Sequence, residues 1–315
     1  MAIIAYSGQL TFTHIAIASI LSGLFWATDM PIRRRLIGDV SGGHLSAAMS
    51  LDSATNSATR MLGPLMGGAM LQLFGITGVY LLSASVYAIA LILILAVKLP
   101  SVVRRTVSPS LIRDLIAGVR FVWGNWELRR VFSVTIVFNA FGFPFTAMIP
   151  ILGRDQLGLQ PVLVGFLSSL EGLGAFLGAM VIAVVARPTL YAKIFCLGAI
   201  FYMVLILYLS ALAYVSGGPL HSFLAAALTL TAIGIAGAGF AAMQSTLTYM
   251  NAEPEYRSRV LGVLALCIGT GPLGFINIGW MAESFGLPTA LAIMAIEGLF
   301  LMLVLWVFDA LNQSE

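Results

Sequence analysis

The 315-residue sequence is 60% hydrophobic and only 9% charged, with a mean hydropathy of +1.00 and a formal net charge of +3. No soluble core of this length needs so many apolar residues, so the composition excludes an ordinary soluble domain and indicates an integral membrane protein. Cys196 and Cys267 stand singly in apolar stretches without metal-binding spacing, so neither a bound metal nor another cofactor is expected.

Apolar runs long enough to cross a hydrocarbon layer of roughly 30 Å recur along the whole chain. Lipid offers the backbone no hydrogen-bond partners, and the runs do not alternate as barrel strands do, so each is expected to be a helix. About nine transmembrane helices are expected, at residues 12–29, 50–73, 76–97, 131–152, 161–186, 189–213, 220–248, 259–282 and 287–308.

Residues 98–130 form the one sizeable stretch that is not expected to span the membrane. Apolar residues recur there at helical spacing, opposite Arg113 and Arg120, and Ser108-Pro109 is a suitable N-terminal cap. The pattern predicts an amphipathic helix on the cytoplasmic membrane surface, although a merely solvated linker is the alternative. The apolar positions are Leu111, Ile112, Leu115, Ile116, Val119 and Val122.

Basic residues gather in alternate loops between the expected spans. Fourteen of the sixteen lie in residues 33–35, 98–130, 187–193 and 257–259, and therefore on one face of the membrane. Because cytoplasmic loops carry the excess of Lys and Arg, we expect a cytoplasmic C-terminus and an outside Met1 in a bacterial-type inner (plasma) membrane. The positive charge then reports topology, and no nucleic-acid partner is expected.

A repeat relates two parts of the chain. Residues 12–75 match residues 223–286 after a shift of 211 residues, with Gly23 over Gly234 and Gly75 over Gly286. Each copy reads as three apolar helices with a charged loop after the first. The three helices between the copies should have partners of their own, so three more helices are expected ahead of residue 1.

Two segments carry a family resemblance. Residues 58–69, ATRMLGPLMGGA, resemble the Gly-Pro-x-x-Gly-Gly signature that the exporters of the major facilitator superfamily have in their fifth helix. Residues 255–275, EYRSRVLGVLALCIGTGPLGF, resemble the junction of the tenth and eleventh helices in the branch that includes the enterobactin exporter and macrolide efflux proteins.

The resemblance implies an all-α major facilitator fold that is truncated to the equivalents of helices four to twelve. Residues 1–97 would be a partial N-terminal bundle, residues 98–130 the cytoplasmic linker and residues 131–315 a six-helix C-terminal bundle. It further implies a secondary active transporter, a proton-coupled exporter of a hydrophobic small molecule such as a drug-like compound or siderophore, working by alternating access. Its partners would be that substrate, protons and the lipid bilayer.

Ionisable groups inside the expected spans are the candidates for proton coupling and gating, because such groups are costly in lipid and usually face a cavity or a partner. Glu171 lies mid-span among small residues, where a carboxyl can serve either as a proton carrier or as a neutral hydrogen-bond donor. Asp52, Asn56 and Arg60 follow at spacings of four and share one helical face. Asp29 stands four residues before Arg33, as a gate residue or in a local ion pair.

Glycine and proline mark two further places. Gly63, Pro64, Gly67 and Gly68 predict a kink at a close helix crossing, and Gly271-Pro272 is their second-half counterpart. By resemblance, the fourth, seventh and tenth helices face the transport path, and ordinary packing is the alternative for each of their residues. The residues that would line the cavity are Phe25, Trp26, Asn56, Asn139, Phe143, Gln244 and Tyr249.

A second hypothesis stays open, namely a transport-incompetent membrane fragment, from a wrong start or a gene relic, with no activity alone. An intramembrane enzyme is not expected, because His14, His44 and His221 are scattered and no nucleophile or paired-carboxylate motif occurs.

Overall fold

The computed structural model describes residues 1–40, 45–96, 111–214, 219–253 and 255–312, and every regular element in these ranges is helical. The α-helices are α1 (Ala2–Tyr6), α2 (Phe12–Val40), α3 (Leu45–Ala96), α4 (Leu111–Gly124), α5 (Trp126–Val137), α6 (Ile149–Ile151), α7 (Pro161–Val185), α8 (Tyr191–Tyr214), α9 (Pro219–Asn251), α10 (Arg257–Ile268), α11 (Gly271–Phe285) and α12 (Leu287–Asn312). Four short segments are π or 3₁₀ helix: η1 (Phe138–Gly142), η2 (Phe143–Met148), η3 (Leu152–Gln156) and η4 (Pro188–Leu190).

Seven helical segments among the described residues are long and apolar enough to cross a membrane. One of them, Ala58–Ala96, contains the expected boundary between the spans 50–73 and 76–97, where Gly75 has non-helical backbone angles. The first expected span lies in α2, whose apolar part, Phe12–Phe25, is shorter. The prediction of an all-α integral membrane fold is confirmed.

Two glycines mark the ends of the sequence repeat in the structure. Gly75 and Gly286, which the repeat superimposes, have φ angles of 64° and 83°. Residues with a Cβ rarely adopt positive φ, so glycine ends a helix cheaply at both positions. Gly75 separates the two spans within α3, and Gly286 separates α11 from α12. The repeat in the sequence is therefore also a repeat of local backbone structure.

The chain divides into two compact units, and each is described by itself. Unit 1 comprises residues 1–106 together with residues 160–166, and within it α1 and α2 both contact α3. Unit 2 comprises residues 107–159 and 167–315. Within unit 2, α8 packs against both α9 and α12, and α11 packs against η1, η2 and α12.

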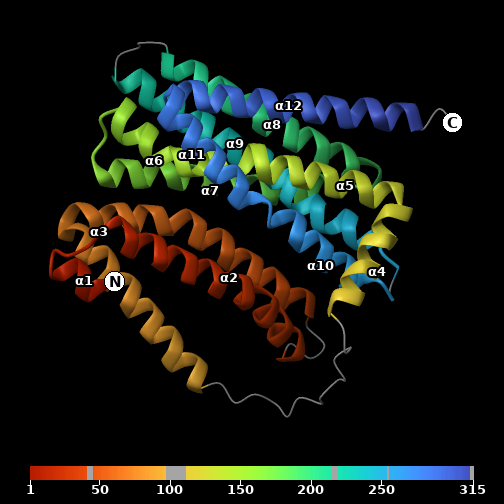
Figure 1. Cartoon of the computed structure of the whole chain (residues 1–315), viewed down its shortest axis with the longest axis horizontal. Helices are drawn as coiled ribbons and strands as arrows, with labels where there is room; N and C mark the ends of the chain where they lie inside the picture. Colours follow the sequence, from red (N-terminus) through yellow and green to blue (C-terminus); the bar gives the residue numbers. More distant parts are fainter. Residues whose placement is uncertain (41–44, 97–110, 215–218, 254, 313–315) are drawn as a thin grey trace. The chain divides into compact units, whose positions relative to one another are not determined.

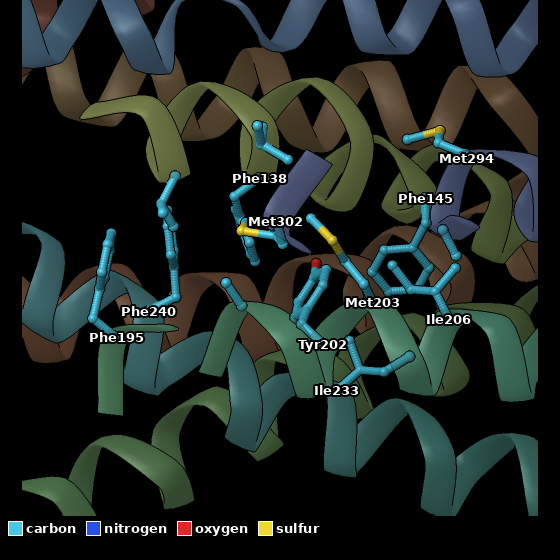
Figure 2. Close-up of a cluster of buried hydrophobic side chains, with 14 of the residues drawn as sticks. Phe138, Phe145, Phe195, Tyr202, Met203, Ile206, Ile233, Phe240, Met294 and Met302 are labelled. Atoms are coloured by element: carbon cyan, nitrogen blue, oxygen red, sulfur yellow. The ribbon is translucent and has the colours of Figure 1, made fainter. Parts of the chain in front are cut away.

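An aromatic cluster forms the centre of unit 2 (Figure 2). The centroid of the Phe138 ring of η1 lies 3.8 Å from that of Phe240 of α9 and 4.6 Å from that of Tyr202 of α8. Phe195 continues the stack, 5.1 Å from Phe240, and Phe145 of η2 meets Tyr202 edge-on at 5.5 Å. Because these large rings are buried and in contact, they fix the irregular η1–η2 segment against α8 and α9.

The linker helix expected near residues 111–122 is α4, and its expected cap, Ser108-Pro109, lies outside the described residues. Asp114 accepts a hydrogen bond from Arg259 Nε of α10 at 2.9 Å, and a Cβ added at Gly118 would lie 2.9 Å from the Arg259 carbonyl oxygen. The Phe121 ring stacks on Tyr256 at 4.6 Å. Figure 1 shows α4 crossing the end of the unit 2 bundle at which α12 ends.

Candidate functional site

The span Trp126–Gln156 begins as a regular helix and becomes irregular about midway. Asn125 caps α5 by accepting a hydrogen bond from the Leu128 amide at 3.1 Å. After Val137 the backbone passes through the π turn η1, the 3₁₀ turn η2 with Pro144, the short α6 with Pro150 and the π turn η3. Proline removes a backbone donor, and π turns displace the regular hydrogen-bond ladder. Such irregular helical backbone at membrane depth needs neighbouring protein groups or a water-filled cavity to satisfy its hydrogen bonds.

A second span is interrupted where α10 ends and α11 begins. Gly269 and Thr270 separate the two helices, and Pro272 stands in the first turn of α11. The Thr270 hydroxyl donates to the Cys267 carbonyl oxygen at 2.8 Å and so satisfies part of the end of α10.

The two interrupted spans touch each other at their irregular parts. A Cβ added at Gly274 would overlap the Ala140 carbonyl oxygen and lie 2.5 Å from Cγ of Pro144. Gly271 is buried next to the Asn139 carbonyl, and the Phe143 and Phe275 rings meet edge-on at 6.1 Å. Glycine at position 274 is therefore required for this close approach.

Three polar side chains are buried beside this contact, and we name Thr135, Asn139 and Gln244 the polar cluster. Gln244 Nε2 donates to the Thr135 hydroxyl at 3.0 Å, which joins α9 to α5. Asn139 Nδ2 donates to the Thr135 carbonyl oxygen at 2.9 Å, and the Thr135 hydroxyl donates to the Val131 carbonyl oxygen at 2.7 Å. All three are less than 9% exposed, so two amides lie in an apolar interior, where they offer directional hydrogen bonds.

The Gln244–Thr135 hydrogen bond is expected to couple the stabilities of α5 and α9. Thr135→Val and Gln244→Leu should each lower the thermal stability of the purified protein, and their effects should be non-additive by about 0.6–1.7 kcal/mol, the range for interhelical hydrogen bonds in membranes. Thr246→Val is the matched control, because the Thr246 hydroxyl donates to the Ala242 carbonyl of its own helix. Additive losses for the pair would contradict an energetically significant bond.

Glu171 is 7% exposed and lies at a different crossing, between α7 and α9. A Cβ added at Gly234 would overlap the Glu171 carbonyl oxygen, and one at Gly174 would overlap the Thr231 carbonyl oxygen. Gly178 continues the contact, since its Cβ would lie 2.8 Å from the Ile235 carbonyl oxygen. The two helices are thus in backbone contact through small residues beside a buried carboxyl.

Helix α9 connects the crossing at Glu171 with the polar cluster. Gly234, which contacts Glu171, and Gln244 of the polar cluster are both on α9, separated by about 15 Å at the ordinary helical rise. Tyr249 lies further along the same helix and is 52% exposed. Its hydroxyl accepts from Arg257 Nη1 at 3.0 Å, and the Arg257 guanidinium lies 4.0 Å from its ring centroid, so it fastens the turn between α9 and α10.

The Gly-Pro motif of α3 forms a close contact inside unit 1. A Cβ added at Gly165 would overlap the Pro64 carbonyl oxygen, and one at Gly68 would overlap the Pro161 carbonyl oxygen. Gln72 strengthens this crossing, because its Nε2 donates to Gln160 Oε1 at 3.1 Å and its Oε1 accepts from the Val162 amide at 3.1 Å. Gly63 and Gly67 have no neighbour within 4 Å of an added Cβ.

The other candidates of unit 1 lie on α2 and α3. Asn56 and Arg60 are exposed one turn apart, as their spacing on a helix requires. Asp29 forms an ion pair with Arg33 at 3.7 Å, and the Phe25 ring meets Tyr87 edge-on at 6.2 Å. The side chains of Trp26 and Asp52 lie outside the described residues.

In unit 2, three expected candidates lie at the contact of the two interrupted spans: Asn139, Phe143 and Gly271. Gln244 is joined to Asn139 through Thr135. Pro272 follows directly in α11. Sequence reasoning missed Thr135, which joins the two amides. Thr135 carries no signal of its own, because the hydroxyl of a single threonine in an apolar span most often donates a hydrogen bond within its own helix. The glycines at 174, 178 and 234, by contrast, are visible in the sequence as small residues that allow helices to approach closely.

The comparisons with known proteins agree with this architecture. The sequence profile of the family described as transmembrane secretion effector matches residues 1–315. The staphyloferrin A transporter of Staphylococcus aureus is 22% identical over 308 residues, covering 94% of this chain and 74% of the relative. The multidrug efflux pump Tap of Mycolicibacterium fortuitum is 25% identical over 318 residues, covering 96% of this chain and 74% of the relative.

Proposed function

Because this chain belongs to the transmembrane secretion effector family of major facilitator transporters, we propose that it exports a hydrophobic small molecule in exchange for protons. The substrate class is a drug-like compound or a siderophore, since the relatives are named as a siderophore transporter and a multidrug efflux pump. The protein is a multi-pass membrane protein of the transporter class. Its proposed activity is to bind and gate a substrate.

The observation that carries the proposal is the contact of two interrupted spans beside the polar cluster. Transporters place their substrate sites at discontinuous helices, where free backbone groups and a few polar side chains meet at membrane depth. Asn139 and Gln244 would orient polar groups of the substrate, and Phe143 with Phe275 would contact its apolar part. The Gly274 contact is the point about which the two spans would shift during alternating access.

Coupling to protons would reside in Glu171, a buried carboxyl on a helix that touches α9 directly. Protonation changes the cost of keeping this group in an apolar interior, so it biases the packing of α7 on α9. Asp29, Asp52 and Arg60 would take part in gating on α2 and α3. Gly63, Pro64, Gly67 and Gly68 would set the stiffness of the crossing that they share with the start of α7.

The membrane topology follows the distribution of basic residues. We place the C-terminus in the cytoplasm and Met1 outside, in an inner membrane of bacterial type. Residues 1–97 and 131–315 would form the two helical bundles of the transport cycle, joined by residues 98–130.

Reconstitution of the chain into liposomes tests the proposal. With an imposed pH gradient, a panel of lipophilic dyes and iron-free siderophores should include a substrate whose addition produces proton flux, and a protonophore should abolish substrate accumulation. Asn139→Ala with Gln244→Ala should lose this flux, whereas Thr246→Val should keep it. If no substrate of the panel elicited proton flux, the result would favour the alternative, a transport-incompetent membrane fragment.

A further inference from the structure

The two long faces of α4 have different environments. Its inner face is fixed to α10 through Asp114, Gly118 and Phe121, and Val122 is buried. On the opposite side Ile116 is 61%, Val119 41% and Trp123 72% exposed. Spacings of three and four place these three side chains along one line of the helix, which we name the outer stripe. An ordinary amphipathic surface helix buries its apolar face and exposes only polar residues, so an exposed apolar stripe is unusual.

Arginines border the outer stripe on one side. Arg120 lies one turn from Ile116 and Trp123, and Arg113 lies on the same edge two turns before Arg120, with both side chains exposed. Arg120 also lines a shallow groove of about 520 Å³ together with Leu115, Ile116, Val119 and Trp123. The groove therefore offers an almost wholly apolar wall with one guanidinium at its margin.

The position of α4 suits a membrane interface. The helix crosses the end of the unit 2 bundle instead of running along it (Figure 1). Because α4 has 14 residues, it extends about 21 Å across that end. Helices that lie in the interface plane combine an apolar stripe with basic residues, and tryptophan rings settle at the level of the lipid headgroups.

Charge decides which partner fits the outer stripe. The loops that the distribution of basic residues places on the same face are themselves basic, with Arg33, Arg34, Arg35, Lys98, Arg104 and Arg105. Such segments repel Arg113 and Arg120, so they are poor partners for this edge. A phospholipid phosphate pairs well with a guanidinium and brings an acyl chain for the apolar groove.

We propose that the outer stripe of α4 binds an anionic phospholipid, with the phosphate on Arg120 and an acyl chain along Ile116, Val119 and Trp123. The bound lipid links the linker helix, and through the Asp114–Arg259 contact also α10, to the composition of the surrounding leaflet. The surface is separate from the polar cluster, so the inference is independent of the transported substrate.

Fluorescence quenching by brominated lipids tests the site. The full chain and its Trp123→Phe variant are placed in nanodiscs of phosphatidylglycerol and phosphatidylcholine, with bromine on only one of the two lipids. The difference between the two proteins isolates the emission of Trp123. Brominated phosphatidylglycerol should quench it with about fivefold higher apparent association than brominated phosphatidylcholine, as expected for one arginine at a lipid surface.

Arg120→Gln should remove this preference while quenching by both lipids persists. Arg154→Gln is the matched control, because Arg154 is exposed and ion-paired with Asp155 in η3, away from α4. Equal quenching of wild-type Trp123 by both lipids would overturn the anionic site. Absence of quenching by either lipid would overturn it as well, because protein would then cover the stripe. Neither result depends on transport.

Discussion

Glu171→Gln is expected to abolish proton-driven transport, down to the level of protein-free liposomes, while the protein stays folded in the membrane. Glutamine keeps the size and most of the hydrogen-bonding capacity of a protonated glutamic acid, but it cannot release a proton. The side chain is buried where α7 and α9 are in backbone contact, so the packing should tolerate this isosteric change. The measurement is substrate-induced proton flux in proteoliposomes under an imposed pH gradient.

A second measurement and a control variant distinguish a loss of proton coupling from a loss of folding in Glu171→Gln. Downhill exchange of substrate without a pH gradient should persist in Glu171→Gln, whereas a merely misfolded protein would lose exchange and flux together. Glu297→Gln is the matched control, because it is the same substitution at an exposed position of α12. Proton flux that survives in Glu171→Gln would remove this residue from the coupling role.

Gly234→Ile is expected to prevent stable folding of unit 2. An added Cβ at this position already overlaps the Glu171 carbonyl oxygen, and the neighbouring atoms belong to the backbone of α7, which cannot move aside as a side chain can. Gly234→Ala should therefore cost about 1–3 kcal/mol, and isoleucine should cost more because its branches meet the same helix. Thermal unfolding and the yield of monodisperse protein in detergent are the measurements.

The control for this series is Gly279 of α11, where an added Cβ has no neighbour within 4 Å. Gly279→Ala and Gly279→Ile should leave stability unchanged or raise it slightly, because glycine is the poorer helix former. If the Gly234 series matched the Gly279 series, the backbone contact between α7 and α9 would not contribute to stability.

The local backbone structure of this protein was visible in the sequence. Long apolar runs predict helices because lipid cannot satisfy the backbone, and they located the six segments between Trp126 and Val307 to within a few residues. The repeat aligned Gly75 with Gly286, and in the structure both glycines stand where helices end, because positive φ angles are cheap only for glycine. Both signals act between neighbouring residues, so no knowledge of distant contacts was needed.

The arrangement of the candidate site depends on contacts that no local pattern encodes. Thr135 and Gln244 are joined across two helices. The η1–η2 segment packs against Gly274, Tyr202 and Phe240, which all lie far along the chain. In a soluble protein the apolar face of a helix indicates which side is buried. In a membrane both the lipid-facing and the protein-facing sides are apolar. The sequence of a membrane helix therefore determines that it spans, and only tertiary packing decides which of its faces meet.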